Sequence, residues 1–452
     1  MFKRVLIANR GEIAVRVIRA CRELGIPTVA VYSQADAKSL HVRLATDAYC
    51  IGPAPSSQSY LNIPAIISTA LMTGCDAIHP GYGFMSERAD FVDICSEHGI
   101  KFIGPSADSM RKMGDKATAR KTMIENNVPV TPGTGILESL EQAREFAHKA
   151  GYPIILKATA GGGGKGMRIV RSDDELETNM NLCQMEAEKF FGNPGIYAEK
   201  FLENPRHIEV QILGDSFGNV IHLGERDCSI QRRHQKLLEE APSPAIDEAT
   251  RKEMGAAAVR AAKAIGYEGA GTCEFLLDHD GKWYFMEMNT RVQVEHCVTE
   301  MISQVDIVRE QILVASGKKL GYTQDDVLLR GHAIECRINA EDPFTFIPSP
   351  GKITSWHAPG GPGMRVDSHV YAGYKVPPYY DSMIGKIIAY GSTREQAIHR
   401  MQVALTEMVV EGIHTNLDLH RELMHDPSFI KGGTNIHYLE QKLAEMFPDN
   451  EK

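Results

Sequence analysis

The sequence has 452 residues, of which 43% are hydrophobic and 24% are charged, and its formal net charge at pH 7 is -9. This length and composition are typical of a globular protein with two to four domains, and the negative charge argues against a nucleic-acid-binding protein. We expect neither a transmembrane helix nor a signal peptide, because there is no run of eighteen apolar residues and Asn9, Arg10 and Glu12 interrupt the first apolar stretch.

The nine cysteines are scattered along the chain, and none forms a CxxC pair. Their odd number and wide spacing are typical of reduced thiols rather than of a disulfide framework or a zinc site. We therefore expect a cytoplasmic protein that is not bound to a membrane.

The first part of the chain alternates between apolar strands and amphipathic helices. The stretch VLIANRGEIAVRVIRACRELGIPTVAVYS predicts a strand, a helix and a second strand, which is a βαβ unit with parallel strands. Its turn has one glycine, Gly11, where a dinucleotide fingerprint needs three. The pattern repeats in CDAIHPGYGFMSERADFVDICSEHGIKFIGPS, where Ser86 is a candidate helix N-cap. Residues 1–114 are therefore expected to form an α/β domain.

From about residue 115 the pattern changes. The chain predicts helices at 115–127 and 137–151, and then two strands that flank the sequence AGGGGKGM. Paired strands, an alanine-rich helix and a hairpin at 272–289 follow, and from about 331 short strands alternate with Pro/Gly turns before a final long helix, TREQAIHRMQVALTEMV. We expect a central domain at 115–330, which includes an insert at about 131–203, and a β-rich domain at 331–446.

The four consecutive glycines suggest a phosphate-binding loop, and three architectures compete. A P-loop needs G-x-x-x-x-G-K-[ST], and TAGGGGKG lacks both the first glycine and the final hydroxyl residue. The glycines do satisfy G-x-G-x-x-G, but that fingerprint opens a helix, whereas the following MRIVRS alternates like a strand. A hairpin tip that closes over phosphates remains, and the alternative is a surface hairpin without a ligand.

Two lysines are candidate phosphate ligands. Lys157 lies on the strand that enters the glycine segment, and Lys116 opens a helix after Gly114-Asp115. Each ammonium could reach a phosphate as a point charge, although a single lysine is more often a solvated surface residue.

Asp280-Gly281 is a two-residue hairpin signal. Such a turn places Glu274 directly opposite Glu287, with Asn289 on the same face. Two carboxylates at this distance are destabilising unless a cation lies between them. Two carboxylates and an amide oxygen are ligands that suit Mg²⁺ or Mn²⁺ shared with substrate phosphates, and the alternative is a solvent-facing polar side of the hairpin.

If the second strand continued through NTRVQVEH, five polar residues at 287, 289, 291, 293 and 295 would share one face. Such a row offers an anion-binding arginine and a candidate general base.

Three further groups of polar residues each allow two interpretations. HIEVQIL reads as an ordinary amphipathic strand, and the basic residues Arg226, Arg232, Arg233, His234 and Lys236 form either a solvated face or an anion site. In GHAIECRINAED, Arg337 either carries a substrate or pairs with Glu335.

Five stretches, NRGEIAVR, IHPGYGFMSE, GGGGKGM, RDCSIQRRHQK and FMEMNTRVQVEH, together resemble the biotin carboxylase component of acetyl-CoA carboxylase. The resemblance covers essentially the whole chain in the correct order. It implies the ATP-grasp fold, an α+β architecture with an N-terminal Rossmann-like α/β domain, a mobile lid and a β-rich C-terminal domain. It also implies ATP-dependent carboxylation of biotin on a carrier protein, with bicarbonate and through carboxyphosphate, which is the first half-reaction of acetyl-CoA carboxylase in fatty-acid synthesis.

The resemblance also implies a role for individual residues. Those implied to contact ATP are Lys116, Lys157, Gly163, Gly164, Met167, Glu199, Lys200, Phe201, Leu202, His207, Gln231, His234, Glu274 and Glu287. Those implied for bicarbonate are Lys236, Arg291, Gln293, Val294 and Glu295, and those implied for the metal are Glu274, Glu287 and Asn289. Glu295 resembles the base that deprotonates bicarbonate, Lys236 and Arg291 the groups that hold it, Arg337 the residue at the biotin ureido group, and Tyr82 a wall of the biotin site.

The implied ligands are ATP, Mg²⁺ or Mn²⁺, and biotin as a substrate. The sequence has no AMKM-like attachment site, so a separate biotin carboxyl carrier protein is expected, together with carboxyltransferase subunits and a homodimer. Three alternatives are a different ATP-grasp ligase, the equivalent subunit of a pyruvate or other acyl-CoA carboxylase, and a non-catalytic nucleotide-binding regulator. The bicarbonate and biotin residues argue against the first and the acidic set against the third, whereas the second shares the same half-reaction.

Overall fold

The computed structural model describes residues 1–159 and 166–447. The chain divides into two compact units, the first formed by Met1–Val128, Arg206–Phe275 and Glu287–Lys452, and the second by Pro129–Pro205 and Leu276–Met286. Gly163 and Gly164 lie outside the described residues. Within the described ranges no helix is long and apolar enough to cross a membrane. All nine cysteines are free, as the sequence predicted.

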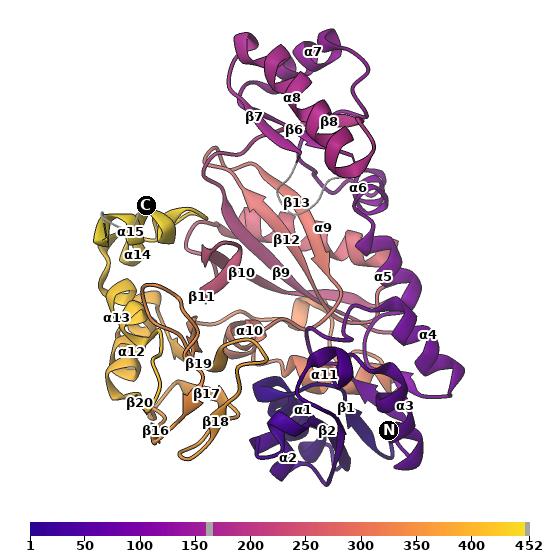
Figure 1. Ribbon diagram of the computed structural model, residues 1–452, viewed down its shortest axis with the longest axis vertical. Coiled ribbons are helices and arrows are strands. Elements are labelled where there is room, and N and C mark those ends of the chain that lie inside the picture. Colours follow the sequence, from indigo (N-terminus) through magenta and orange to yellow (C-terminus); the bar gives the residue numbers. More distant parts are fainter. Residues whose placement is uncertain (160–165, 448–452) are drawn as a thin grey trace. The chain divides into compact units, whose positions relative to one another are not determined.

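The N-terminal part of the first unit is drawn in indigo and purple in Figure 1. It contains a parallel five-stranded sheet with the strand order β3-β2-β1-β4-β5. Its strands are β1 Val5–Ile7, β2 Thr28–Ser33, β3 Asp47–Gly52, β4 Ala77–His79 and β5 Lys101–Phe102. Its helices are α1 Gly11–Glu23, α2 Leu40–Leu44, α3 Ile63–Met72, α4 Ala89–Glu97 and α5 Ala107–Gly114. The predicted βαβ unit is confirmed. The order reverses between β1 and β4, and the carboxyl ends of such neighbouring strands usually border a ligand-binding crevice.

The predicted N-cap at Ser86 is wrong. Helix α4 begins at Ala89, three residues later, and no side chain caps it. Two backbone hydrogen bonds, from Ser86 to Gly83 and from Arg88 to Met85, keep the preceding segment in turns and delay the helix.

The second unit contains a three-stranded sheet with the order β7-β6-β8, in which both pairs are antiparallel. Its strands are β6 Ile154–Ala158, β7 Met167–Val170 and β8 Ile196–Lys200, and its helices are α7 Leu140–Ala150 and α8 Asp173–Phe191. The strands that flank the glycine segment therefore form a hairpin, in which Lys157 pairs with Met167. A strand rather than a helix follows the glycines, which rules out a dinucleotide fingerprint.

An eight-stranded sheet has the order β13-β12-β9-β10-β11-β14-β19-β17, and it belongs to the first unit except for residues 276–286 at the hairpin end of β12 and β13. Its strands are β9 Arg206–Gly214, β10 Val220–Arg232, β11 Gln235–Ala241, β12 Gly269–Leu277, β13 Trp283–Asn289, β14 His332–Asn339, β17 Met364–Ser368 and β19 Met383–Gly391. Two small ribbons are formed by β15 Gly351–Lys352 with β18 Lys375–Val376, and by β16 Ser355–His357 with β20 Val409–Glu411. The helices are α6 Lys116–Glu125, α9 Glu248–Ala264, α10 His296–Ser303, α11 Ile307–Ala315, α12 Arg394–Glu407, α13 Leu417–His425, α14 Pro427–Ile430 and α15 Tyr438–Met446.

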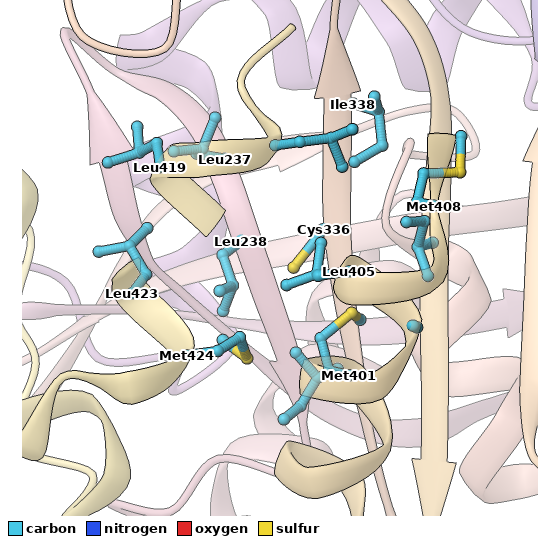
Figure 2. Close-up of a cluster of buried hydrophobic side chains, with 14 of the residues drawn as sticks. Leu237, Leu238, Cys336, Ile338, Met401, Leu405, Met408, Leu419, Leu423 and Met424 are labelled. Carbon is cyan, nitrogen blue, oxygen red and sulfur yellow. The ribbon is translucent and has the colours of Figure 1, made fainter. Parts of the chain in front are cut away.

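The two faces of this sheet differ in polarity. On β14, Cys336 and Ile338 pack into an apolar cluster with residues of β11, α12 and α13. Figure 2 labels its members Leu237, Leu238, Cys336, Ile338, Met401, Leu405, Met408, Leu419, Leu423 and Met424. Because side chains alternate along a strand, Glu335 and Arg337 point to the opposite face. Burial of the apolar face thus decides which charged residues reach the candidate site.

The hairpin between β12 and β13 forms, but the predicted two-residue turn is wrong. The N–H of Asp278 donates to the carbonyl of Lys282, so the loop has three residues, 279–281. Gly281 adopts a φ of +80°, a conformation that glycine tolerates without a steric penalty. The expected direct opposition of Glu274 and Glu287 depended on the shorter turn and loses that basis.

The predicted polar row from 287 to 295 does not lie on one strand. Strand β13 ends at Asn289, and α10 starts at His296 with Glu295 as its N-cap. The completely buried side chain of Val292 draws the intervening segment into the core, which breaks the alternation.

Candidate active site

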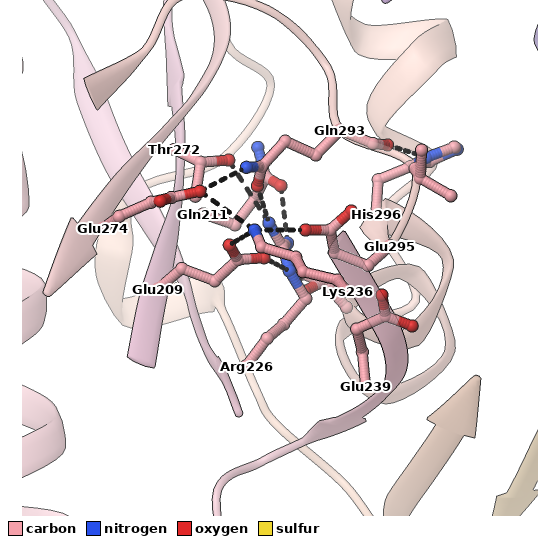
Figure 3. Close-up of polar contacts among 12 residues, drawn as sticks. Glu209, Gln211, Arg226, Lys236, Glu239, Thr272, Glu274, Gln293, Glu295 and His296 are labelled. Carbon is pink, nitrogen blue, oxygen red and sulfur yellow. Dashed lines mark hydrogen bonds and ion pairs between the residues drawn. The ribbon is translucent and has the colours of Figure 1, made fainter. Parts of the chain in front are cut away.

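Arg226 on β10 lies at the centre of a buried polar network (Figure 3). Its three nitrogens donate to Glu209 Oε1 at 2.5 Å, Gln211 Oε1 at 2.7 Å, Thr299 Oγ1 at 3.0 Å, Thr272 Oγ1 at 3.2 Å and Gln293 Oε1 at 2.8 Å. A buried guanidinium is tolerated only when its donors are satisfied, and five acceptors meet its five N–H groups. The prediction that Arg226 is solvated or holds an anion is therefore wrong, because it is buried and binds side chains from β9, β12, α10 and the segment before α10.

The neighbouring basic residues Arg232, Arg233 and His234 do not share the surroundings of Arg226. The guanidinium carbon of Arg232 lies 3.9 Å from the centre of the Phe346 ring. Arg233 and His234 are exposed in the two-residue turn between β10 and β11, with φ of +49° and +64°. Non-glycine residues rarely adopt this conformation, and such strain concentrates at functional sites.

Lys236 on β11 holds three carboxylates together (Figure 3). Its Nζ donates to Glu209 Oε2 at 2.6 Å, Glu274 Oε1 at 2.9 Å and Glu295 Oε1 at 2.7 Å. Burial disfavours the ammonium, but Glu209 and Glu295 outweigh it and raise the pKa of Lys236 well above its ordinary value. The site is thus built around a permanent cation.

Glu295 is shared between two cations. Its Oε1 accepts from Lys236, and its Oε2 accepts from Arg337 Nη2 at 2.9 Å. Burial alone would raise the pKa of Glu295, but Lys236, Arg337 and Arg226 hold it well below its usual range. In this arrangement Glu295 is an anion with little affinity for a proton.

Arg337 on β14 also binds a second carboxylate, because its Nε donates to Glu239 Oε1 at 2.6 Å. The predicted alternative pairing of Arg337 with Glu335 is wrong. Both carboxyl oxygens of Glu335 are buried and have no hydrogen-bond partner in the described part of the chain. Burial raises the pKa of Glu335 well above its ordinary value.

Glu274 on β12 is 3% exposed and is surrounded by donors. Its Oε1 also accepts from Asn289 Nδ2 at 2.7 Å and from Gln293 Nε2 at 2.8 Å, and its Oε2 lies 3.0 Å from His207 Nε2. Burial opposes the charge of Glu274, yet Lys236 and His207 lower its pKa. The amphipathic-strand interpretation of HIEVQIL is therefore wrong in one respect, since its polar residues His207, Glu209 and Gln211 are buried toward this network.

Glu274 and Glu287 fit a divalent cation. Glu287 is exposed at the surface, but the surrounding protein and the negative charge of Glu274 raise its pKa. Two carboxylates that repel each other gain stability from a cation between them, and Mg²⁺ prefers such oxygen ligands. Asn289 fits less well, because its Oδ1 accepts from Arg291 Nη2 at 3.1 Å.

The other candidates for the bicarbonate and biotin sites are Arg291, Val294 and Tyr82, and each of them contacts a further residue of the first unit. Arg291 donates through Nε to Glu87 Oε2 at 2.9 Å. The carbonyl of Val294 accepts from the ammonium of Lys386, and the hydroxyl of Tyr82 donates to Glu12.

Two nucleotide candidates of the first unit lie on nearby elements. Gln231 is buried on β10 and pairs with Lys236 of β11. Lys116 is exposed at the first position of α6, whose N-cap Asp115 accepts from the N–H of Thr118 at 2.7 Å. A cation at a helix N-terminus opposes the helix dipole, so this placement favours an anionic partner for Lys116.

The nucleotide candidates of the second unit cluster on its sheet. Lys157 donates through Nζ to Glu199 Oε2 at 2.5 Å, and Met167 is exposed on the neighbouring strand. The ammonium of Lys200 donates to the carbonyls of Gly151 and Tyr152 at 3.0 and 3.1 Å. The backbone N–H groups of Lys200 and Phe201 donate to the carbonyls of Pro132 and Pro153, so these two donors are already used within the unit, and Leu202 is buried beside them.

Four site residues were not identified from the sequence, Glu12, Glu87, Glu239 and Lys386, and two others, Glu209 and Arg226, were expected in different surroundings. Most of them carry no local signal, because their partners come from strands far apart in the chain. Lys386 is the exception, since MIGKIIAY places a single charge in an otherwise apolar strand. A lone lysine in such a strand indicates a buried ion pair.

Three family models match consecutive parts of the chain. They describe a biotin carboxylase N-terminal domain at residues 1–110, the ATP-binding domain of the carbamoyl-phosphate synthase L chain at 115–323, and a biotin carboxylase C-terminal domain at 335–441. A relative named biotin carboxylase, from Pseudomonas aeruginosa, is 58% identical over 446 residues, which cover 98% of this chain and 99% of the relative.

Solved structures match over the same length. A biotin carboxylase–β-γ-ATP complex from Campylobacter jejuni is 53% identical with a TM-score of 0.89 and covers 98% of this chain and 99% of its own. The biotin carboxylase domain dimer of the Hydrogenobacter thermophilus 2-oxoglutarate carboxylase, in complex with MgADP, ADP and bicarbonate, is 50% identical with a TM-score of 0.87 and covers 98% of both chains. The predicted fold class is thereby confirmed.

Proposed function

The chain belongs to the biotin carboxylase family, and from this premise we propose that it carboxylates biotin on a carrier protein with ATP and bicarbonate. The observation that carries the proposal is the convergence of Lys236, Glu295 and Arg337. The ammonium of Lys236 and the guanidinium of Arg337 each donate a hydrogen bond to the same carboxylate, that of Glu295. This set can hold an anion, take its proton and stabilise a second developing negative charge.

The first step activates bicarbonate. Lys236 and Arg291 hold the anion, which competes with the carboxylates for these cations. When Lys236 turns to bicarbonate, Glu295 loses part of the attraction that lowers its pKa and becomes a stronger base. Glu295 then takes the bicarbonate proton, a bicarbonate oxygen attacks the γ-phosphorus of ATP, the bond to the bridging oxygen breaks, and ADP leaves carboxyphosphate behind.

The second step transfers CO₂. The bond between the carboxyl carbon and the phosphate oxygen breaks, and the released phosphate takes the N1′ proton of biotin. The N1′ nitrogen then attacks CO₂ to give carboxybiotin. Arg337 stabilises the negative charge that develops on the ureido oxygen, and Tyr82, beside the carboxyl ends of β1 and β4, forms a wall of the biotin site.

Glu274 and Glu287 would hold Mg²⁺ or Mn²⁺, with Asn289 as a further ligand once its oxygen is released from Arg291. The metal would neutralise charge on the phosphates of ATP. In the first unit, Lys116, His207, Gln231 and His234 are the proposed nucleotide contacts; in the second unit, they are Lys157, Gly163, Gly164, Met167 and Glu199 to Leu202. The proposed domains remain 1–114, 115–330 and 331–446.

The proposed partners are a biotin carboxyl carrier protein, carboxyltransferase subunits and a second copy of this chain, in the cytoplasm. The homodimer is supported by the dimeric Hydrogenobacter thermophilus domain. We propose the acetyl-CoA carboxylase reaction as the physiological context.

Release of ADP from ATP by the purified full chain tests the proposal. We expect release to require bicarbonate and to accelerate when free biotin is added, whereas added amino acids should have no effect. Release that is independent of bicarbonate, or that is unaffected by biotin, would overturn the assignment.

A further inference from the structure

Lys386 is a charged residue in the middle of a sheet core. It lies on β19, directly opposite Arg337 of β14 on one side and Asp367 of β17 on the other, and its side chain is 0% exposed. An ammonium that is fully removed from water costs several kcal/mol unless its partners compensate. The contacts that compensate this charge therefore matter for the role of Lys386.

The contacts of Lys386 point to the catalytic segment. Its ammonium donates to the backbone carbonyl of Val294, and its Nζ lies 3.6 Å from Glu12 Oε1. Burial opposes the charge, but acidic groups that include Cys297, Glu12 and Glu335 raise the pKa of Lys386 above its ordinary value. These groups favour the ammonium form of Lys386, so its hydrogen bond to Val294 is charge-assisted, and such bonds are about twice as strong as neutral ones.

Val294 and Glu295 need such a contact, because they lie in a turn between the end of β13 and the start of α10. No strand ladder fixes this turn. The carboxylate of Glu295 is held by Lys236 and Arg337, and the carbonyl of the preceding peptide is held by Lys386 from the sheet. Together these contacts set the direction of the Glu295 side chain.

A second contact leads to the proposed biotin site. The hydroxyl of Tyr82 donates to Oε1 of Glu12, the same oxygen that faces Lys386. Glu12 lies in the first turn of α1, after β1, and Tyr82 follows β4, so both lie at the reversal of strand order. Glu12 therefore connects Tyr82 to Lys386, and Lys386 to the turn that carries Glu295.

We propose that Lys386 is a positioning residue that orients Glu295 through the carbonyl of Val294, and that Glu12 links this contact to Tyr82. The inference rests on the proposed function. In the proposed reaction Lys386 touches no reacting atom and acts only through Glu295 and Tyr82. Its loss should therefore affect the bicarbonate and biotin steps and leave nucleotide binding intact.

The test compares Lys386→Met and Glu12→Gln with the wild-type chain. Bicarbonate-dependent ADP release is measured with and without biotin, and binding of ADP is measured separately. For Lys386→Met we expect kcat to fall about tenfold or more and KM for bicarbonate to rise, because a charge-assisted hydrogen bond is lost, while KM for ATP and the affinity for ADP stay within about twofold. Glu12→Gln keeps an acceptor for Tyr82 and should change the same two parameters less.

Glu335→Gln is the matched control, because it replaces a buried carboxyl group beside Lys386 and removes no hydrogen bond in the described part of the chain. It should leave KM for bicarbonate at the wild-type value. A folded Lys386→Met variant with wild-type kinetics would overturn the inference, and so would a fall in kcat with unchanged KM for bicarbonate, which indicates only a loss of active protein.

If Lys386→Met does not fold, Glu12→Gln decides: a raised KM for bicarbonate supports the inference, and wild-type kinetics overturn it. Failure of the proposed function looks different. Wild-type protein without bicarbonate-dependent ADP release would overturn both, whereas an active wild type with an equally active Lys386→Met variant overturns the inference alone.

Discussion

Lys236 and Glu295 form an ion pair in which Nζ lies 2.7 Å from Oε1, and the same ammonium is hydrogen-bonded to Glu209 and Glu274. This pairing keeps the pKa of Glu295 well below its usual range and makes it a poor base before substrate binds. Bicarbonate that competes for Lys236 would weaken this ion pair and raise the pKa of Glu295, which makes Glu295 a stronger base. The base would then be strongest when its substrate is in place, which limits unproductive proton transfer.

Glu295→Gln should keep nucleotide binding and lose carboxylation. The amide preserves the shape of the side chain but cannot accept the bicarbonate proton, and loss of a general base typically lowers the rate about 10²–10⁴-fold. Steady-state assays of bicarbonate-dependent ADP release, with ADP binding measured in parallel, check this. Glu248→Gln, at a 66% exposed side chain, is the control. Full carboxylation by Glu295→Gln would remove Glu295 as the base.

Arg337→Ala should damage biotin turnover more than nucleotide binding. Removal of the guanidinium takes away the proposed stabiliser of the ureido oxygen and leaves Glu239 and Glu295 without a shared cation. We expect biotin-dependent turnover to fall about 10²-fold or more, as for the loss of one oxyanion donor. ADP affinity and biotin-dependent ADP release are the two readouts. Equal damage to both would argue against a place for Arg337 at biotin.

Replacing Arg226 should destabilise the fold rather than change specificity. Arg226→Met leaves the buried carboxylate of Glu209 and two amide oxygens without this donor, and breaking a buried pair costs about 3–5 kcal/mol. Arg226→Lys should recover little, because an ammonium cannot reproduce five planar hydrogen bonds. Chemical unfolding of both variants measures the loss. Arg111→Lys, an exposed ion pair with Asp93, is the control and should cost less than about 1 kcal/mol.

The extent to which the site could be predicted differs between its residues. Glu274, Arg291 and Glu295 were identified because carboxylates and an arginine in an apolar stretch carry a chemical signal. Arg226 was misassigned, because a basic residue in a polar run looks solvated. Its burial depends on Glu209 and Gln293, which approach it only when β9 and the segment before α10 come together in the fold.

The elements of the fold likewise differ in how far the sequence predicts them. The βαβ unit at β1–α1–β2 and the helix α12 were predictable, because their apolar spacing alone determines a buried face. The hairpin turn was not, since Asp-Gly suits both a two-residue loop and the observed three-residue loop with Gly281 at positive φ. The course of residues 290–295 depends on Val292 entering the core, which is a tertiary effect.

Glu287→Gln should weaken metal binding without harming the fold. Glu274 contributes to the raised pKa of Glu287, so neutralising Glu287 relieves repulsion in the metal-free protein. We expect the Mg²⁺ concentration for half-maximal ADP release to rise about tenfold, while the midpoint of chemical unfolding is unchanged or higher. Asp280→Asn, at the exposed hairpin tip, is the control. An unchanged Mg²⁺ requirement would contradict the metal assignment.

Acid should destabilise the N-terminal sheet through His41. Burial lowers the pKa of this completely buried imidazole to about 4. The unfolded chain binds a proton near pH 6.5 and the folded chain does not, so the contribution is complete above pH 6.5 and is lost as pH falls toward 4. Between pH 7.5 and 5 the loss is about 2 kcal/mol. The free energy of unfolding of the wild type and of His41→Gln is measured across this range. It should depend less steeply on pH in the variant, and equal slopes would contradict the role of His41.

The central claim is that bicarbonate is activated by ATP through carboxyphosphate in the site built around Lys236, Glu295 and Arg337. Incubation of the chain with ATP, Mg²⁺, free biotin and ¹⁸O-labelled bicarbonate, followed by mass spectrometry of the released phosphate, tests it most directly. The account predicts that one bicarbonate oxygen appears in each phosphate and that ¹⁸O-labelled carboxybiotin forms alongside it. Phosphate that carries no label from bicarbonate would contradict the account.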